Sequence, residues 1–172
     1  MKSRILSLVA AALLLLSCGS SKTTTSTSTG NAYAVPPTIQ TSFSTQYPTA
    51  SNVVWGAYDV ATVPIDWELT SWTALTPTDY AVTFDMDGNK YYSWYDANGN
   101  WVGSSYALTD NSSLPAAVNT TVTNRYPGYS IDKVQREIWK DHVAYEIKLK
   151  GGDNKVKLLV DEAGNVLKEK NK

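Results

Sequence analysis

Apolar side chains recur at every fourth position in two short segments of the chain. The first set is Ile39, Phe43 and Tyr47, and the second is Val118, Val122 and Tyr126. This spacing places each set on one face of a short amphipathic helix. A proline precedes each set and a Tyr-Pro pair ends it, as is typical of helix boundaries. The pattern therefore predicts two short helices, which begin after Pro36 and Pro115.

After each predicted helix, the pattern changes to the alternation of apolar and polar residues that is typical of half-buried strands. In the second half of the chain it predicts strands at 131–139, 143–150, 155–161 and 165–169. The sequences KDH, GGDN and DEAG separate them and are typical of turns. We therefore predict that each helix covers one face of an antiparallel meander of about four strands.

The two halves of the chain also resemble each other. Residues 35–48 align with 114–127 at an offset of 79 residues, whereas YAVTF at 80–84 aligns with YEIKL at 145–149 at an offset of 65. The first half thus has 14 additional residues between its first two strands. Self-similarity of this kind predicts an α+β tandem repeat, with one helix and a four-stranded sheet in each unit. The predicted units are 35–107 and 108–172.

An Asp-x-x-Gly sequence occurs at corresponding places in both halves, in DANGNW at 96–101 and DEAGNV at 161–166. It could belong to a calcium loop or to a tight turn between strands. A calcium loop needs alternating oxygen ligands and a bidentate Glu near the end of twelve residues. Residues 85–96 instead contain a whole predicted strand. The repeated position favours a type I turn followed by a bulge, with no metal or other cofactor.

The N-terminus has the features of a secretory signal. Lys2 and Arg4 precede an apolar run at 5–16, which is too short for a mature transmembrane helix. The sequence LLSC that ends at Cys18 resembles the bacterial lipobox. That resemblance implies a signal peptide at 1–17 and lipid attachment at Cys18; the alternative is an ordinary signal peptide that contains a cysteine. Cys18 is the only cysteine, so we expect no disulfide.

Residues 18–34 are rich in Ser, Thr and Gly, and they cannot bury enough apolar surface to fold. We predict that they tether the folded part to a membrane. No acidic residue follows Cys18 in this segment, which resembles the sorting signals of lipoproteins retained in the outer membrane. The resemblance implies an envelope protein on the outer membrane that faces the periplasm, with the cell surface as the alternative.

Charge and residue usage argue against several function classes. Without residues 1–17 the net charge is −3, which disfavours general nucleic-acid binding. His142 is the only histidine and lies in a predicted turn, and no GxSxG sequence occurs, so neither a Ser-His-Asp site nor a histidine-rich metal site is indicated. Asp66 and Glu68 lie close in sequence, but we expect them to be solvated. The sequence predicts no enzyme.

The two halves differ most in charge and in aromatic content. Residues 22–113 have a net charge of −6 and contain five of the six tryptophans, whereas residues 114–172 have a net charge of +3. Strand alternation places Tyr92 and Trp94 beside small residues on the sheet face opposite the helix. The expected partner-binding residues are Tyr92, Trp94, Trp67, Trp72 and Trp101. This face could be an exposed binding surface, it could be covered by the 14 additional residues, or its aromatic side chains could simply be exposed singly, as on ordinary protein surfaces.

The helix that ends in YP, the sequence YEIKL, a Gly-Asp hairpin and VKLLVDEAGNVLKEK, with a second copy, together resemble the PepSY-like, β-lactamase-inhibitor-like family of secreted bacterial proteins. The resemblance covers about 36–106 and 114–170. It implies units of one helix and four strands whose sheets can join side by side. The characterised β-lactamase inhibitor protein is similar in architecture, but this chain lacks the cysteines of its disulfides, and no contact residue carries over.

These observations lead to one expected function and one alternative. We expect a non-enzymatic, lipid-anchored envelope protein that binds a protein partner, for example as an inhibitor, through the aromatic outer sheet face of its first unit. The alternative is a glycan- or peptidoglycan-binding module, because tryptophan and tyrosine rings also stack on sugars. The chemical nature of the ligand would distinguish the two.

Overall fold

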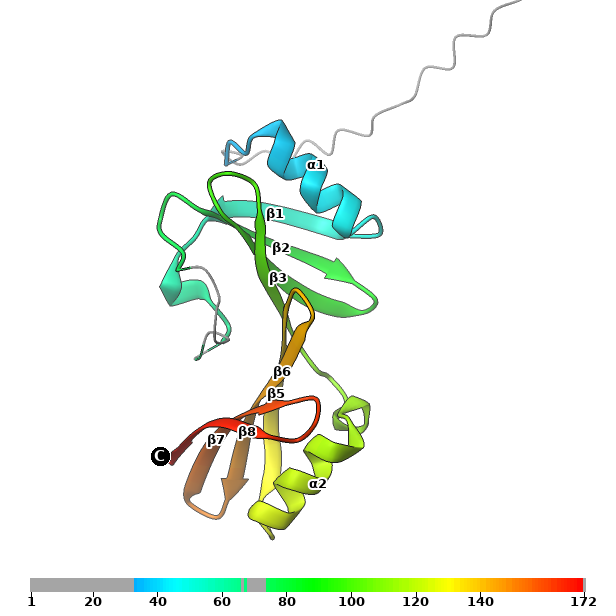
Figure 1. The fold of residues 1–172 in the computed structure, drawn as a ribbon, viewed down its shortest axis with the longest axis vertical. Helices are drawn as coiled ribbons and strands as arrows, with labels where there is room; N and C mark the ends of the chain where they lie inside the picture. The colour runs from blue at the N-terminus through cyan, green and yellow to red at the C-terminus, as the bar shows by residue number, and fades with distance from the viewer. Residues whose placement is uncertain (1–32, 66, 68–73, 172) are drawn as a thin grey trace, which may run out of the picture. The chain divides into compact units, whose positions relative to one another are not determined.

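The strands of the molecule form a single antiparallel sheet in which they follow one another in chain order (Figure 1). The computed structural model describes residues 33–65, 67 and 74–171. The elements are α1 (Pro37–Gln46), β1 (Ser51–Ala57), the 3-10 helix η1 (Val60–Thr62), β2 (Tyr80–Met86), β3 (Asn89–Tyr95), β4 (Trp101–Ala107), the 3-10 helix η2 (Asn111–Ser113), α2 (Ala116–Arg125), β5 (Ser130–Trp139), β6 (His142–Gly151), β7 (Asn154–Asp161) and β8 (Val166–Asn171).

The continuous sheet corrects the predicted fold class. The predicted α+β tandem repeat, with one helix and a four-stranded sheet in each unit, is wrong, because β4 pairs with β5 and joins all eight described strands in one sheet. The pairing runs from Ser104 opposite Ile138 to Ala107 opposite Gln135. It satisfies backbone groups that would otherwise line two further sheet edges. The described part of the chain is therefore mostly β-structure, with two α-helices.

Both α-helices begin immediately after a proline, as the sequence predicted. Pro36 and Pro115 are the N-cap residues, and the buried positions of the helices are those with the four-residue spacing. Helices this short are stable in water only when their apolar face is packed. α1 packs its buried face on Val82, Phe84 and Tyr95, and α2 packs on strands β5 to β7. Packing, more than intrinsic propensity, holds the two helices in place.

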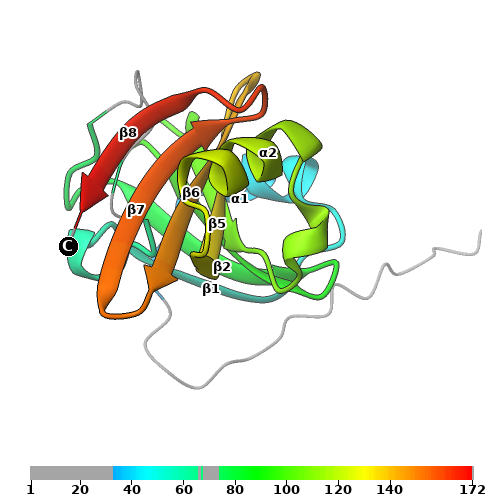
Figure 2. The ribbon, with the colours of Figure 1, turned by 90° about the horizontal axis from the view of Figure 1, so that it is seen from below.

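Both helices lie on the same face of the sheet, and the two project over one another in Figure 2. Val134 and Ile138 are four positions apart on β5, so both side chains point to the same side of the sheet. Val134 packs in the cluster beneath α2, and Ile138 packs against the cluster beneath α1. We call the opposite side the outer face. Tyr92 and Trp94 point to it, opposite Thr83 and Ala81, as the alternation predicted.

The two Asp-x-x-Gly sequences form turns, as predicted. Asp96 Oδ1 accepts hydrogen bonds from the backbone N–H groups of Asn98 and Asn100, at 2.9 and 2.8 Å. Asp161 Oδ1 accepts one from the backbone N–H of Asn165 at 2.8 Å. The register shifts beside each turn are the predicted bulges. The two carboxylates thus close the turns. Burial alone would raise the pKa of Asp96 and Asp161, but the hydrogen bonds of the turns outweigh it and lower both pKa values.

Candidate functional site on the outer sheet face

A segment of the chain between β1 and β2 crosses the outer face. We call residues 58–65 and Trp67 the cover segment. At one end, Tyr58 and Ile65 pack against Trp94 and Val102. At the other end, Trp67 packs against the cluster of Ala144 and Leu159, on β6 and β7. The cover segment thus reaches from the strands of the first half to those of the second half.

Side chains of the sheet hold the backbone of the cover segment. Gln135 Nε2 donates a hydrogen bond to the Pro64 carbonyl oxygen at 3.4 Å. Glu146 Oε2 accepts a hydrogen bond from the Trp67 backbone N–H at 3.1 Å. The Lys157 ammonium group lies 5.4 Å from the centre of the Trp67 ring, within the range of a cation–π contact. The outer face therefore binds a stretch of polypeptide through both its backbone and an aromatic side chain.

Two carboxyl groups are buried beneath this segment. Glu137 on β5 and Glu146 on β6 are 0% and 1% exposed. Glu146 Oε1 lies 3.8 Å from the ammonium group of Lys157, whereas neither side-chain oxygen of Glu137 has a hydrogen-bond partner among the described residues. Burial is the main cause that raises the pKa of Glu137 to about 9. Repulsion from the Glu146 carboxylate also raises this pKa, whereas attraction to Lys168 lowers it in part. Glu137 is therefore protonated at neutral pH.

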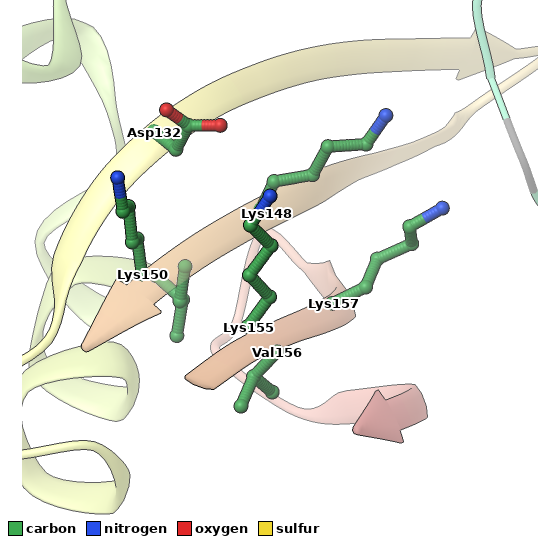
Figure 3. Close-up of a pocket in the computed structure, with 7 residues that line it drawn as sticks. Asp132, Lys148, Lys150, Lys155, Val156 and Lys157 are labelled. Carbon is green, nitrogen blue, oxygen red and sulfur yellow. The ribbon is translucent and has the colours of Figure 1, made fainter. Parts of the chain in front are cut away.

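A pocket lined by lysines lies on the outer face next to the cover segment (Figure 3). It has a volume of about 220 Å³. Its lining residues are Asp132, Lys148, Leu149, Lys150, Lys155, Val156 and Lys157. Figure 3 shows the four lysine side chains on one side of β6 and β7, while Val156 points to the other side. Lys157 belongs both to this pocket and to the contacts of the cover segment.

The structure brings only some of the sequence-predicted site residues together. Tyr92 is half-buried on the outer face, and Trp67 lies on the same face further along the sheet. Trp94 is 2% exposed, so of the three arrangements considered for this face, the structure shows coverage by the additional segment. Trp72 and Cys18 lie outside the described residues, as do Asp66 and Glu68.

Trp101 lies on the helix side of the sheet. Its indole N–H contacts the hydroxyl groups of Ser93 and Ser104, at 3.1 and 2.9 Å. The Tyr47 hydroxyl, which comes from the residue after α1, is 2.6 Å from the Ser104 hydroxyl. Trp101 thus helps to fix α1 to the sheet and does not extend the aromatic surface on the outer face.

His142 is exposed at the start of β6, where its ring stacks on Trp139 with centroids 5.3 Å apart. Its Nε2 atom lies 3.5 Å from Asp141. Asp141 is itself exposed on the turn, so the two residues do not line a cleft.

Within the described ranges, no group of three or more His, Cys, Asp or Glu side chains is arranged to hold a metal ion. The arrangement of the outer face is suited to binding polypeptide.

Sequence reasoning missed the second half of the outer face. Glu137 and Glu146 looked like ordinary charged strand positions, because nothing in the sequence indicates that a segment some 80 residues earlier covers them. The lysine pocket did leave a signal. Lysines occur at alternate positions on β6 and again on β7, so strand alternation alone would have placed all four on one face.

Solved structures from Bacteroides share this fold. A DUF2874 family protein from Bacteroides uniformis is 19% identical, with a TM-score of 0.63 over 80% of this chain and 90% of that one. A second DUF2874 family protein, from Bacteroides ovatus, is 22% identical, with a TM-score of 0.63 over 81% and 89%. A BLIP-like protein from Bacteroides fragilis is 25% identical, with a TM-score of 0.62 over 81% and 88%.

The search of curated proteins gave no significant match. Among the described residues, no helix is both long and apolar enough to cross a membrane. A family model matches residues 78–168, which is just over half of the chain and includes β2 to β7 and the first half of β8. The match confirms the resemblance seen in the sequence: the chain belongs to the PepSY-like family, which is described as "Putative beta-lactamase-inhibitor-like, PepSY-like".

Proposed function

We propose that this protein is a non-enzymatic, lipid-anchored envelope protein that binds a partner protein on its outer sheet face and acts on that partner as an inhibitor. The inhibitor-like description of its family supports the proposal. The BLIP-like name of the similar Bacteroides fragilis protein agrees with it. Neither description identifies the partner, so the argument for protein binding depends on the outer face.

One observation carries the proposal: the outer face already holds a piece of polypeptide, the cover segment. Gln135 and Glu146 bind a carbonyl oxygen and an N–H group of the cover segment, and such contacts do not depend on the side chains of the bound segment. The Trp67 ring adds an anchor of the kind that is enriched in protein interfaces. A face with these properties can bind a loop of another protein beside the cover segment.

The aromatic residues have different roles in this proposal. Tyr92 and Trp67 keep part of their surface accessible and are the proposed contacts with the partner. Trp94 lies beneath the cover segment and supports it. Because its ring faces are covered, Trp94 does not form the open stacking platform on which the glycan alternative depended.

The location proposed for the protein derives from its N-terminus. The LLSC sequence at 15–18 and the polar residues up to 34 support a lipid anchor at Cys18 and a short tether. A lipidated protein of this kind would reside in the envelope, on the periplasmic side of the outer membrane. Mass spectrometry of the mature protein would test this directly, since acylation at Cys18 and loss of residues 1–17 both change its mass.

Affinity capture from an envelope extract tests the proposed function. The bait is the full chain in detergent, alongside a Tyr92→Ala/Trp67→Ala variant whose circular dichroism matches that of the unchanged protein. We expect at least one envelope protein to be retained by the unchanged bait and lost by the variant. The purified candidate is then assayed for its own activity with and without the unchanged chain.

A control variant, Tyr33→Ala, removes an exposed aromatic side chain that packs on Tyr80 of the α1 cluster, away from the outer face. It should retain the same candidate as the unchanged bait. If all three baits retain the same proteins, or if the purified candidate does not bind the unchanged chain directly, the outer face is not a protein-binding surface and the proposal is wrong.

A further inference from the structure

Lysines form a row across the outer face of the second half. Lys133 lies opposite Lys148, and Lys148 lies opposite Lys157. Lys157 in turn lies opposite Lys170 on the edge strand β8. Neighbouring strands are about 4.8 Å apart, so this row spans roughly 14 Å. A second pair, Lys150 opposite Lys155, lies beside the row and completes the pocket of Figure 3.

This arrangement is unfavourable for folding alone. Like charges at directly opposite positions of an antiparallel pair destabilise a sheet. Among the described residues that line the pocket, Asp132 is the one acidic residue against four lysines, and Glu146 lies 3.8 Å from Lys157. Among the described residues, no hydrogen bond or ion pair engages the ammonium groups of Lys150 and Lys155. An acidic ligand would offset the repulsion between Lys150 and Lys155, which lie opposite each other.

The geometry points to acidic side chains on an extended segment. Lys148 and Lys150 are two positions apart on one strand, which corresponds to about 6.6 Å. Carboxylates at alternate positions of an extended peptide have the same separation. The pocket volume of about 220 Å³ suits one or two such side chains. Lys157 connects the pocket to the cover segment, so the same face would bind the backbone and the charges of one polypeptide.

We propose that the lysine-lined pocket binds acidic side chains, at alternate positions, of an extended segment of the partner protein. The proposal rests on the proposed function, since it assigns the charge of the segment that the partner presents to the outer face. It also explains why the second half of the chain is basic whereas the first half is acidic. The charge then serves recognition, and a partner without an acidic segment would be rejected.

The test measures binding of a defined peptide to the full chain. The probe is fluorescein-labelled Glu-Ser-Glu-Ser-Glu, titrated in detergent at fixed ionic strength and followed by fluorescence anisotropy; Gln-Ser-Gln-Ser-Gln is the uncharged control. We expect saturable binding of the acidic peptide only. Lys150→Gln/Lys155→Gln should raise its Kd at least tenfold, and binding to the unchanged protein should weaken as salt is added.

The matched control is Lys90→Gln/Lys140→Gln, which removes the same charge at positions outside the pocket. It should change the Kd less than twofold. Equal weakening by both double variants, or no saturable binding of the acidic peptide, would overturn the proposal. So would tighter, pocket-dependent binding of phosphatidylglycerol vesicles than of the peptide, because the ligand would then be an anionic lipid.

Both double variants should fold. Loss of Lys150 and Lys155 relieves repulsion between opposite lysines, and Lys90 and Lys140 are exposed. Thermal unfolding of each variant checks this. The peptide measurement is independent of the capture experiment. Binding of the peptide without a captured partner would leave the pocket assigned and the proposed function wrong. Capture of a partner that is lost with Tyr92 and Trp67 but retained by Lys150→Gln/Lys155→Gln would leave the function standing and remove the pocket from it.

Discussion

At the scale of single residues, Glu137 is the least expected side chain of the outer face. Its carboxyl group is fully buried and close to a second carboxyl group, and it has no hydrogen-bond partner in the part of the chain that the structure describes. A charged form would be strongly disfavoured there, so folding is linked to protonation of Glu137. The pKa raised to about 9 in the folded chain compares with an ordinary value of 4.5.

We predict that Glu137→Gln stabilises the protein in a pH-dependent manner. The raised pKa means that the folded state keeps a proton that the unfolded chain releases above about pH 4.5. The unchanged protein should therefore lose stability as the pH rises from about 4.5 to 9, whereas the variant should lose less. At pH 8 the gain should be on the order of 1–3 kcal/mol, measured by urea unfolding.

Glu162→Gln serves as the control, because Glu162 is half-exposed beside Arg136. It should change the free energy of unfolding by less than about 1 kcal/mol at pH 8. Equal slopes of stability against pH for the unchanged protein and for Glu137→Gln would show that Glu137 is ionised in the folded chain.

At the scale of elements, the helices, the strand faces and the Asp-x-x-Gly turns could be predicted from the sequence. Local spacing and turn chemistry determine them, as for the four-residue spacing of Ile39 and Phe43. Coverage of Trp94 by the additional residues was one of the arrangements that the sequence left open. The burial of Glu146 could not be predicted, because it depends on a segment that is distant in sequence. The face of Trp101 was also out of reach, since the bulge beside it shifts the alternation.

The turn between β7 and β8 also contacts α2, and this contact gives a prediction. Gly164 has a φ of +88°, and a Cβ atom there would lie 2.8 Å from the Ala117 carbonyl oxygen and from Thr121 Oγ1. Gly164→Ala should therefore lower the free energy of unfolding by about 2–4 kcal/mol, through backbone strain and the clash with α2 together. Thermal or urea unfolding measures the loss.

Two other glycines separate the causes. Gly88 also has a positive φ, of +75°, but has free space around it, so Gly88→Ala should show the strain alone, about 1 kcal/mol. Gly56 has neither feature, and Gly56→Ala should change the stability by less than about 1 kcal/mol. Equal effects of Gly164→Ala and Gly88→Ala would show that α2 yields to the added methyl group.

At the scale of the whole molecule, the joined sheet explains why the predicted fold class was wrong. Self-similarity indicated two units but not that β4 and β5 would pair. Leu108 packs against both core clusters, and Arg136 on β5 donates a hydrogen bond to the Tyr106 hydroxyl on β4 at 3.0 Å. These contacts couple the stability of the two halves.

We therefore predict that the described part of the chain unfolds in one transition. Tryptophan fluorescence reports mainly on the first half, which has five of the six tryptophans, whereas far-ultraviolet circular dichroism reports on the whole sheet. In urea the two signals should give the same midpoint, within error, as expected of two-state unfolding. Separate midpoints would show that the β4–β5 junction does not couple the halves.

The chain order of the strands has a consequence for how the molecule forms. Each strand pairs with the strand before it in the sequence, so the sheet can grow in the direction in which the chain is synthesised. Pairings between near neighbours in sequence also favour rapid folding. The cover segment is the exception, because Trp67 can form its contacts only after Glu146 and Leu159 have been made. The outer face would therefore stay open until the last strands are made, which gives a newly made chain a short period in which that face is accessible.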